Sequence, residues 1–186
     1  MVNHVEFFEG LIKGRQSCRD YSDKAVDIKL LYEIIEMAKN APSACNSQPW
    51  RLFLTCTPDE NAKMKNCLQD GGKNKFLDEA QAFIAVYKKD EIVLNAGTEV
   101  KFTSSHFAEY DMGEFVAYLT LAAKCKGLDS CIIGWVNSEK LNETFSLTGR
   151  CDIVVAFGYA KDATVRDKKR KELKEIIINY KRENHD

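Results

Sequence analysis

Apolar positions recur along this chain with helical spacing in some stretches and as short continuous runs in others, which predicts helices alternating with strands. Six helices are predicted, over 2–13, 27–41, 59–69, 111–126, 138–147 and 168–180. Four strands are predicted, over 51–55, 82–87, 131–135 and 152–159. The resulting order ααβαβαβαβα indicates an α+β or α/β domain.

Cap and turn residues mark several ends of these elements. Asp27 is suited to cap the second helix, and Asp111 is expected to begin the long helix. Pro42 and Gly127 are expected to end the same two helices. Residues 88–110 show no clear period, and we expect a loop there, since unstructured connections of that length are usually functional or disordered.

Length and charge limit the class of protein. The 186 residues favour one domain spanning 1–186. A chain of this size buries about 70% of its unfolded surface and needs no cross-links. With 27 basic and 28 acidic residues, the net charge of −1 argues against a nucleic-acid or membrane-surface protein. No apolar run approaches the roughly 18 residues of a membrane span, and residues 1–6 lack signal-peptide features, so we expect a soluble, cytoplasmic protein.

Residues that commonly carry catalysis are scarce. The P-loop, the G-x-G-x-x-G fingerprint, H-E-x-x-H and G-x-S-x-G are all absent from the sequence. Of three histidines, only His106 lies away from the ends, where it lines a pocket or is a polar surface residue. The seven cysteines include no C-x-x-C pair, so we expect mostly small buried thiols and no disulfides. We predict no metal site and no side-chain catalyst.

Three polar clusters remain as candidate binding segments. The first is 15–19, Arg-Gln-Ser-Cys-Arg. In an extended backbone Arg15, Ser17 and Arg19 lie on one side, and two guanidinium groups with a hydroxyl suit a phosphate dianion. A solvated turn carrying two charges is the alternative.

The second cluster, 41–50, is uncharged and holds two of the three prolines. A rigid loop rich in neutral donors and acceptors suits a planar polar heterocycle. A buried connection whose side chains satisfy one another is the alternative.

The third cluster is the basic run 168–171 at the start of the last predicted helix. Basic residues at a helix N-terminus oppose the helix dipole, which favours an anionic partner there. A solvated run of charges is the alternative.

Together these segments resemble the FMN-dependent nitroreductase family. The most specific piece is the Pro-Ser-x-x-Asn-x-Gln-Pro-Trp stretch of 42–50. The other matching pieces follow in the family's order across nearly the whole chain: 15–19, Asp111-Met112-Gly113, Gly127-Leu128, Ile133-Gly134-Trp135, Gly158-Tyr159 and 168–170. The resemblance implies an α+β fold with a mixed central β-sheet flanked by helices. It also implies an intertwined homodimer with FMN at the subunit interface.

The resemblance further implies a role for each segment. The phosphate and ribityl end of FMN would be held by Arg15, Ser17 and Arg19, in a segment that includes Gln16, and by Lys168 and Arg170. The flavin would meet the partner's Pro42, Ser43 and Asn46. Ile133 and Gly134 would lie over the N5 edge, and Lys75 would approach the pyrimidine edge. The substrate pocket would be lined by Phe102, His106, Phe107 and Tyr110.

The implied reaction is hydride transfer from NADH or NADPH through FMN to a nitroaromatic, quinone or flavin by a ping-pong mechanism. Because the cofactor would carry the chemistry, the scarcity of histidines is explained. One alternative keeps the fold with dehalogenation, azoline oxidation or flavin cleavage. Another is a non-enzymatic FMN-binding or storage protein. A thiol-redox or metal-binding protein rests on the cysteine count alone and fails on spacing.

Overall fold

The computed structural model describes residues 3–89 and 105–180, without the side chains of 105 and 106. Its centre is a four-stranded sheet in the order β1-β2-β4-β3. The strands are β1 (Trp50–Thr55), β2 (Ala82–Lys88), β3 (Asp129–Ile133) and β4 (Arg150–Gly158). All three neighbouring pairs are antiparallel.

The α+β class is therefore confirmed, but the sheet differs from the mixed sheet that was expected. Within the described ranges, the parallel pairing is a single bridge between Ser17 and Ser130. The strands were recognisable because the two central ones are buried on both faces. Residues 82–87 of β2 are all buried, which produces the continuous apolar run in the sequence.

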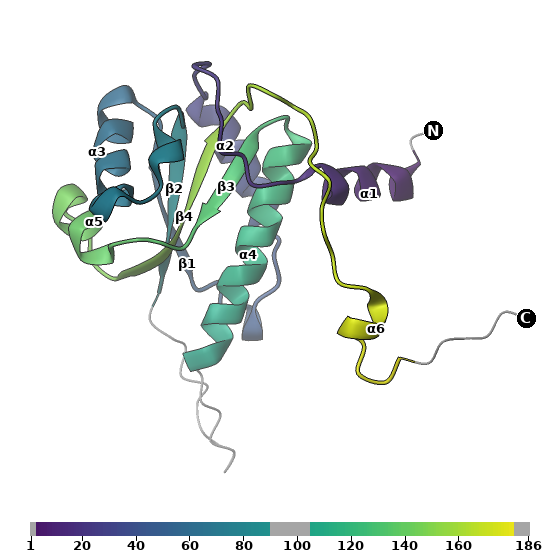
Figure 1. The fold of residues 1–186 in the computed structure, drawn as a ribbon. Coiled ribbons are helices and arrows are strands. Elements are labelled where there is room, and N and C mark those ends of the chain that lie inside the picture. Colours follow the sequence, from purple (N-terminus) through teal and green to yellow (C-terminus); the bar gives the residue numbers. More distant parts are fainter. Residues whose placement is uncertain (1–2, 90–104, 181–186) are drawn as a thin grey trace, which may run out of the picture.

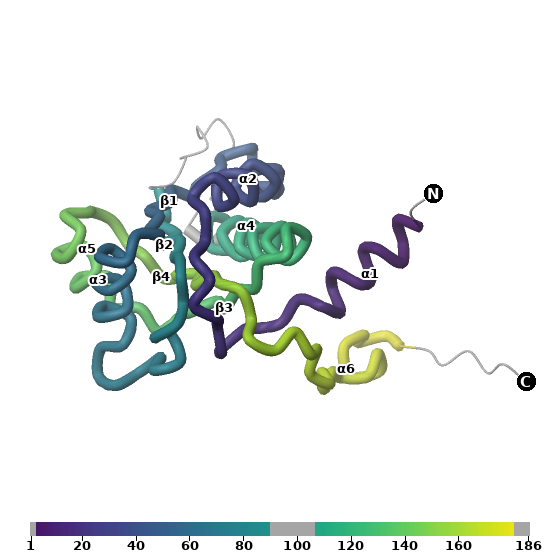
Figure 2. The backbone as a smooth tube through the Cα atoms, turned by 90° about the horizontal axis from the view of Figure 1, so that it is seen from above, coloured from purple at the N-terminus to yellow at the C-terminus, as the bar shows by residue number. Residues whose placement is uncertain are grey.

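Helices cover both faces of the sheet (Figure 1). α2 (Ile28–Ala38) and α4 (Ser105–Cys125) lie on one face, and α3 (Pro58–Leu68) and α5 (Ser138–Phe145) on the other (Figure 2). Each face has its own apolar core, one built around Phe115 and Leu119 of α4 and the other around Met64 and Leu141. None of the helices in the described ranges is long and apolar enough to span a membrane.

The element order ααβαβαβαβα is confirmed, and two cap predictions hold. The Asp27 carboxylate accepts a hydrogen bond from the backbone N–H of Lys29 at the start of α2. Gly127 follows α4 with φ of 75°, the left-handed conformation that glycine tolerates.

The start of α4 was predicted wrongly. The helix is already present at Ser105, so Phe107 and Tyr110 belong to its first turns and not to a loop. Asp111 is only 5% exposed and occupies the buried stripe that Ala108 and Phe115 also share. A charged residue at a buried stripe position hides the helical period, which explains the error.

The last helix was also predicted too long. α6 covers only Leu173–Ile176, and residues 161–172 are not helical. α6 and α1 (His4–Gly14) stand away from the body of the molecule (Figures 1 and 2). Neither helix buries a residue within the described chain. The apolar stripe of α6 therefore lacks the packing that would stabilise a longer helix.

Candidate functional site: an anion cavity at the edge of the sheet

The segment 15–19 lies along the outer edge of β3. Ser17 forms the bridge to Ser130, and the backbone N–H of Cys18 donates to the Ser130 carbonyl at 2.9 Å. Farther along, Tyr21 bridges to Ala160 beyond the end of β4. This pairing brings 15–19 beside the non-helical segment 161–172.

A cavity of about 290 Å³ opens where these two segments meet. Its lining comes from Arg15, Gln16, Ser17 and residues 166–170. The Lys168 ammonium donates to the carbonyl of Arg15 at 2.7 Å and of Ile12 at 3.3 Å, and also to the carbonyl of Lys13. The structure therefore brings together the first and third clusters of the sequence, 15–19 and 168–170, which are about 150 residues apart in the chain.

The cavity concentrates positive charge. Burial, followed by the charges of Arg15, Arg170 and Arg166, lowers the pKa of Lys168. Within the described residues none of these four cations forms a salt bridge. An anion bound here would relieve their mutual repulsion and pair with their remaining N–H groups. The donor set therefore fits the phosphate group of FMN.

Arg19 extends this cluster toward the residues that precede β2. Its guanidinium lies 5.6 Å from the centre of the Phe76 ring, next to the exposed Lys75. Cys131 is buried close by. Burial raises the pKa of that thiol, against the opposing influence of the Arg19 charge and a hydrogen bond with Ser17.

The loop 41–50 is held by α4. Asp111 accepts hydrogen bonds from the Ala44 backbone N–H at 3.0 Å and from the Ser47 hydroxyl at 3.2 Å. The Ser43 hydroxyl accepts from the Gln48 backbone N–H at 3.0 Å. Three residues of the loop are non-glycine with positive φ: Cys45, Asn46 and Gln48. The loop is thus a fixed and strained structure, not a plain surface connection.

Within one chain this loop and the anion cavity lie near opposite ends of α4. Asp111 anchors the loop, while the Lys124 side chain lies beside Gly14, whose neighbour Arg15 lines the cavity. The 13 residues from Asp111 to Lys124 span about 20 Å at 1.5 Å of rise per residue. A single chain therefore does not bring Pro42, Ser43 and Asn46 to the phosphate end of the site.

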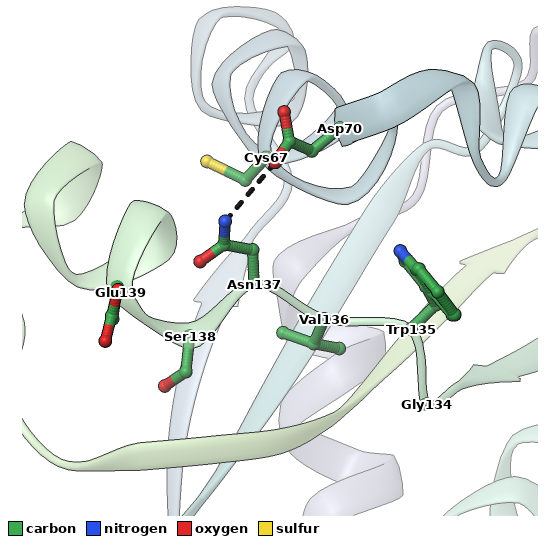
Figure 3. A pocket seen from close by; sticks show the side chains of 8 residues that line it. All are labelled: Cys67, Asp70, Gly134, Trp135, Val136, Asn137, Ser138 and Glu139. Atoms are coloured by element: carbon green, nitrogen blue, oxygen red, sulfur yellow. Dashed lines mark hydrogen bonds between the residues drawn. The ribbon is translucent and has the colours of Figure 1, made fainter.

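β3 ends at the buried Ile133, and Gly134 is exposed directly after it. Gly134 also lines a second cavity, of about 630 Å³, which lies between the C-terminal end of α3 and the N-terminal end of α5 (Figure 3). There the Asn137 amide donates to the Asp70 carboxylate at 3.3 Å, as the dashed line marks (Figure 3). Hydrogen bonds from Lys140 and Asn137 lower the pKa of Asp70.

Of the residues expected to form the substrate pocket, Phe107 and Tyr110 are 41% and 67% exposed on α4, near the loop that Asp111 holds. Phe102 and the side chain of His106 lie outside the described residues.

Sequence reasoning missed two residues of this arrangement. Arg166 lines the cavity, and its guanidinium donates to the Ser17 carbonyl at 2.9 Å. Asp111 was assigned to the start of a helix, not to the support of the loop. Neither contact has a local signal, because the partners are 149 and 67 residues apart.

The fold and the cavity define an α+β protein with a cationic cavity lined by residues from its N- and C-terminal segments. Residues 12–159 match the model of the nitroreductase family, and the chain belongs to that family. The Bacillus subtilis protein named "Putative NAD(P)H nitroreductase YdgI" is 28% identical, in a match that covers 79% of this chain and 83% of YdgI.

Solved structures share the fold. The crystal structure described as a "putative nitroreductase in complex with FMN" from Exiguobacterium sibiricum has a TM-score of 0.79 at 21% identity. That match covers 94% of this chain and 97% of the Exiguobacterium chain. The FMN-dependent nitroreductase NfnB of Mycobacterium smegmatis, in complex with NADPH, has a TM-score of 0.71 at 19% identity. That match covers 93% of this chain and 97% of the NfnB chain.

Proposed function

We propose that this protein is an FMN-dependent NAD(P)H oxidoreductase that reduces a small electron-poor acceptor: a nitroaromatic, a quinone or a flavin. The observation that carries the proposal is the cationic cavity formed by Arg15, Ser17, Lys168 and Arg170, without a carboxylate paired to its cations in the described chain. The FMN and NADPH complexes of structures with the same fold support it.

The anion cavity would take the FMN phosphate. A phosphate monoester carries close to two negative charges at neutral pH, so it calls for several cations. Arg15 and Arg170 supply planar forks suited to its oxygens, while Lys168 supplies a point charge. Arg19 and Lys75 would extend the positive potential along the cofactor toward its pyrimidine edge, as their placement near Phe76 allows.

The site would be completed by a second copy of the chain. The loop lies about 20 Å from the cavity along α4, so in the same chain it is not beside the phosphate end of the cofactor. The partner's Pro42, Ser43 and Asn46 would meet the flavin instead. Apolar side chains on α1 and α6 support an interface, since Val5, Phe8 and Ile176 are each more than half exposed. We therefore propose a homodimer.

Gly134 is suited to the reactive edge of the flavin. It is exposed, and apart from its chain neighbours no atom lies within 4 Å of where a Cβ would be, so a ligand could approach its backbone closely. Ile133 is buried and fixes the end of β3 beneath it. When bound, FMN would supply the two-electron chemistry, accepting a hydride at N5 and returning it to the acceptor. The chain has only to bind and orient the reactants, which would use one open pocket in turn.

The test begins with the purified protein and its visible spectrum. We expect a yellow protein that holds FMN, bleaches anaerobically with NADH or NADPH, and recovers its colour when a nitroaromatic or quinone is added. A protein that stays colourless and cannot be reconstituted with FMN contradicts the proposal. Retained FMN that NAD(P)H does not reduce would favour a storage role.

The binding assignments have their own test. Arg15→Ala and Arg170→Ala should each weaken FMN binding by about 1.5–3 kcal/mol, the usual contribution of hydrogen bonds to charged groups. Unchanged FMN affinity in the double variant would refute the phosphate assignment. Sedimentation should give a dimer, and a monomer that retains FMN would contradict the two-chain site.

A further inference from the structure

Arg166 occupies a special position at the rim of the anion cavity. It lines this cavity together with Arg15 and Lys168, and it also lines a neighbouring cavity of about 300 Å³. Its guanidinium nitrogens Nε and Nη2 donate to the Gln16 side-chain oxygen at 3.2 Å and to the Ser17 carbonyl at 2.9 Å. These bonds use two of the five N–H donors of a guanidinium and leave three for a ligand.

Gln16 holds Arg166 in that orientation. Its side-chain oxygen accepts from both the backbone N–H (3.1 Å) and the Nε of Arg166, and its amide nitrogen donates to the Thr164 carbonyl at 2.9 Å. Both lone pairs of the oxygen are therefore used within the protein. Three hydrogen bonds from one side chain fix the backbone of 164–166 as well as the guanidinium.

Arg166 forms no salt bridge with an acidic side chain in the described residues. Three aspartates line the neighbouring cavity, and each has its own partner. Asp20 pairs with Lys161 at 3.0 Å, Asp129 pairs with Lys124 at 2.9 Å, and Asp162 accepts from the Thr164 backbone N–H at 2.8 Å. Asp167 also lines the first cavity, but within the described residues no acidic side chain forms a salt bridge with Arg166, so its free N–H groups can pair with an anion there.

We propose that Arg166 is a further ligand of the phosphate group and that Gln16 is its positioning residue, acting through Arg166 and not on the cofactor. This role rests on the proposed function. A preoriented guanidinium loses little side-chain entropy when it binds an oxyanion, because protein hydrogen bonds already hold its plane. Gln16 thereby raises affinity for the phosphate without touching it.

The test compares FMN with riboflavin, which lacks the phosphate. Arg166→Ala should weaken FMN binding by about 10- to 100-fold, the range for charged hydrogen bonds, and leave riboflavin binding unchanged. Arg166→Lys should lose less, since it keeps the charge without the fork. Arg150→Ala is the matched control, because this exposed arginine pairs with Asp152 at the start of β4. The Arg150→Ala protein should bind both flavins with wild-type affinity.

Gln16→Leu separates positioning from direct contact. It should weaken FMN binding in the wild-type background and have a clearly smaller effect in Arg166→Ala, because the hydrogen bond that orients the guanidinium is already lost there. In the apo protein, the Arg166 backbone N–H should exchange faster with solvent in Gln16→Leu than in the wild type. An additive loss of FMN affinity when Gln16→Leu and Arg166→Ala are combined would overturn the positioning role. Equal exchange rates of the Arg166 N–H in Gln16→Leu and in the wild type would show that the hydrogen bond to Gln16 does not form.

The failures of the two proposals are distinguishable. A wild-type protein that binds neither flavin overturns the proposed function and this role with it. If the wild type prefers FMN to riboflavin and both Arg166 variants keep the full preference, only the role of Arg166 is overturned. Equal losses of FMN and riboflavin affinity in Arg166→Lys would likewise contradict a contact with phosphate.

Discussion

Asp111 is the support on which the loop 41–50 depends, and Asp111→Ala should both destabilise the chain and disorder the loop. The carboxylate accepts two hydrogen bonds, from the Ala44 N–H at 3.0 Å and the Ser47 hydroxyl at 3.2 Å. A hydrogen bond to a charged group contributes about 1.5–3 kcal/mol. Both donors are partly exposed and can turn to water, so we expect a combined loss of about 2–3 kcal/mol.

Strain in the loop means that Asp111→Ala affects folding stability and FMN affinity to different extents. Cys45, Asn46 and Gln48 hold positive φ, which costs roughly 1–2 kcal/mol per residue. Without the Asp111 anchor the loop can relax to ordinary φ values, and part of the lost stability returns. FMN affinity does not return, because the proposed flavin contacts of the loop depend on the strained geometry. We therefore expect Asp111→Ala to lose more free energy of FMN binding than free energy of unfolding.

Urea unfolding of the apo protein, followed by tryptophan fluorescence, measures the free energy of unfolding, and FMN titration measures affinity. Ser47→Ala removes only the longer hydrogen bond and should lose about 1 kcal/mol or less. Adding it to Asp111→Ala should change nothing more, since the two residues share one interaction. An Asp111→Ala protein within about 0.5 kcal/mol of the wild type, with full FMN affinity, would refute the reasoning.

Three further changes test the fold itself. Gly158→Ala should cost about 1–3 kcal/mol in free energy of unfolding, because the added Cβ would lie 2.7 Å from a ring carbon of the fully buried Tyr21; wild-type stability on chemical denaturation would contradict this close approach. Thr57→Ala should cost about 1 kcal/mol by removing the capping box of α3, whereas Thr57→Ser should retain most of it, and equal losses would rule out the cap. In the native protein at pH 8, a thiol reagent should modify Cys151 only after unfolding, since the thiol is buried and burial raises its pKa to about 12; native labelling of Cys151 would show that its strand opens.

Local patterns were sufficient for the order of elements. The buried run of β2 and the cap at Asp27 are set by neighbours in the sequence, so period and cap chemistry identified them. The prediction of where α4 starts failed because the buried Asp111 carboxylate is hydrogen-bonded by Ser47 and Ala44, which are 64 and 67 positions away in the sequence. The predicted length of α6 was wrong because Leu173 and Ile176 stay exposed in the described chain, without the packing that stabilises a helix.

By itself the sequence determined the composition of the anion site, because a phosphate requires cations and the cationic segments 15–19 and 168–170 are visible as residue types. Only the tertiary structure decided how they meet. The pairing of Ser17 with Ser130 carries the first segment to the edge of the sheet, and the hydrogen bonds of Gln16 draw Arg166 to its rim. Tertiary structure also decided that the loop 41–50 lies about 20 Å away along a rigid helix, which is why the proposed site needs a second chain.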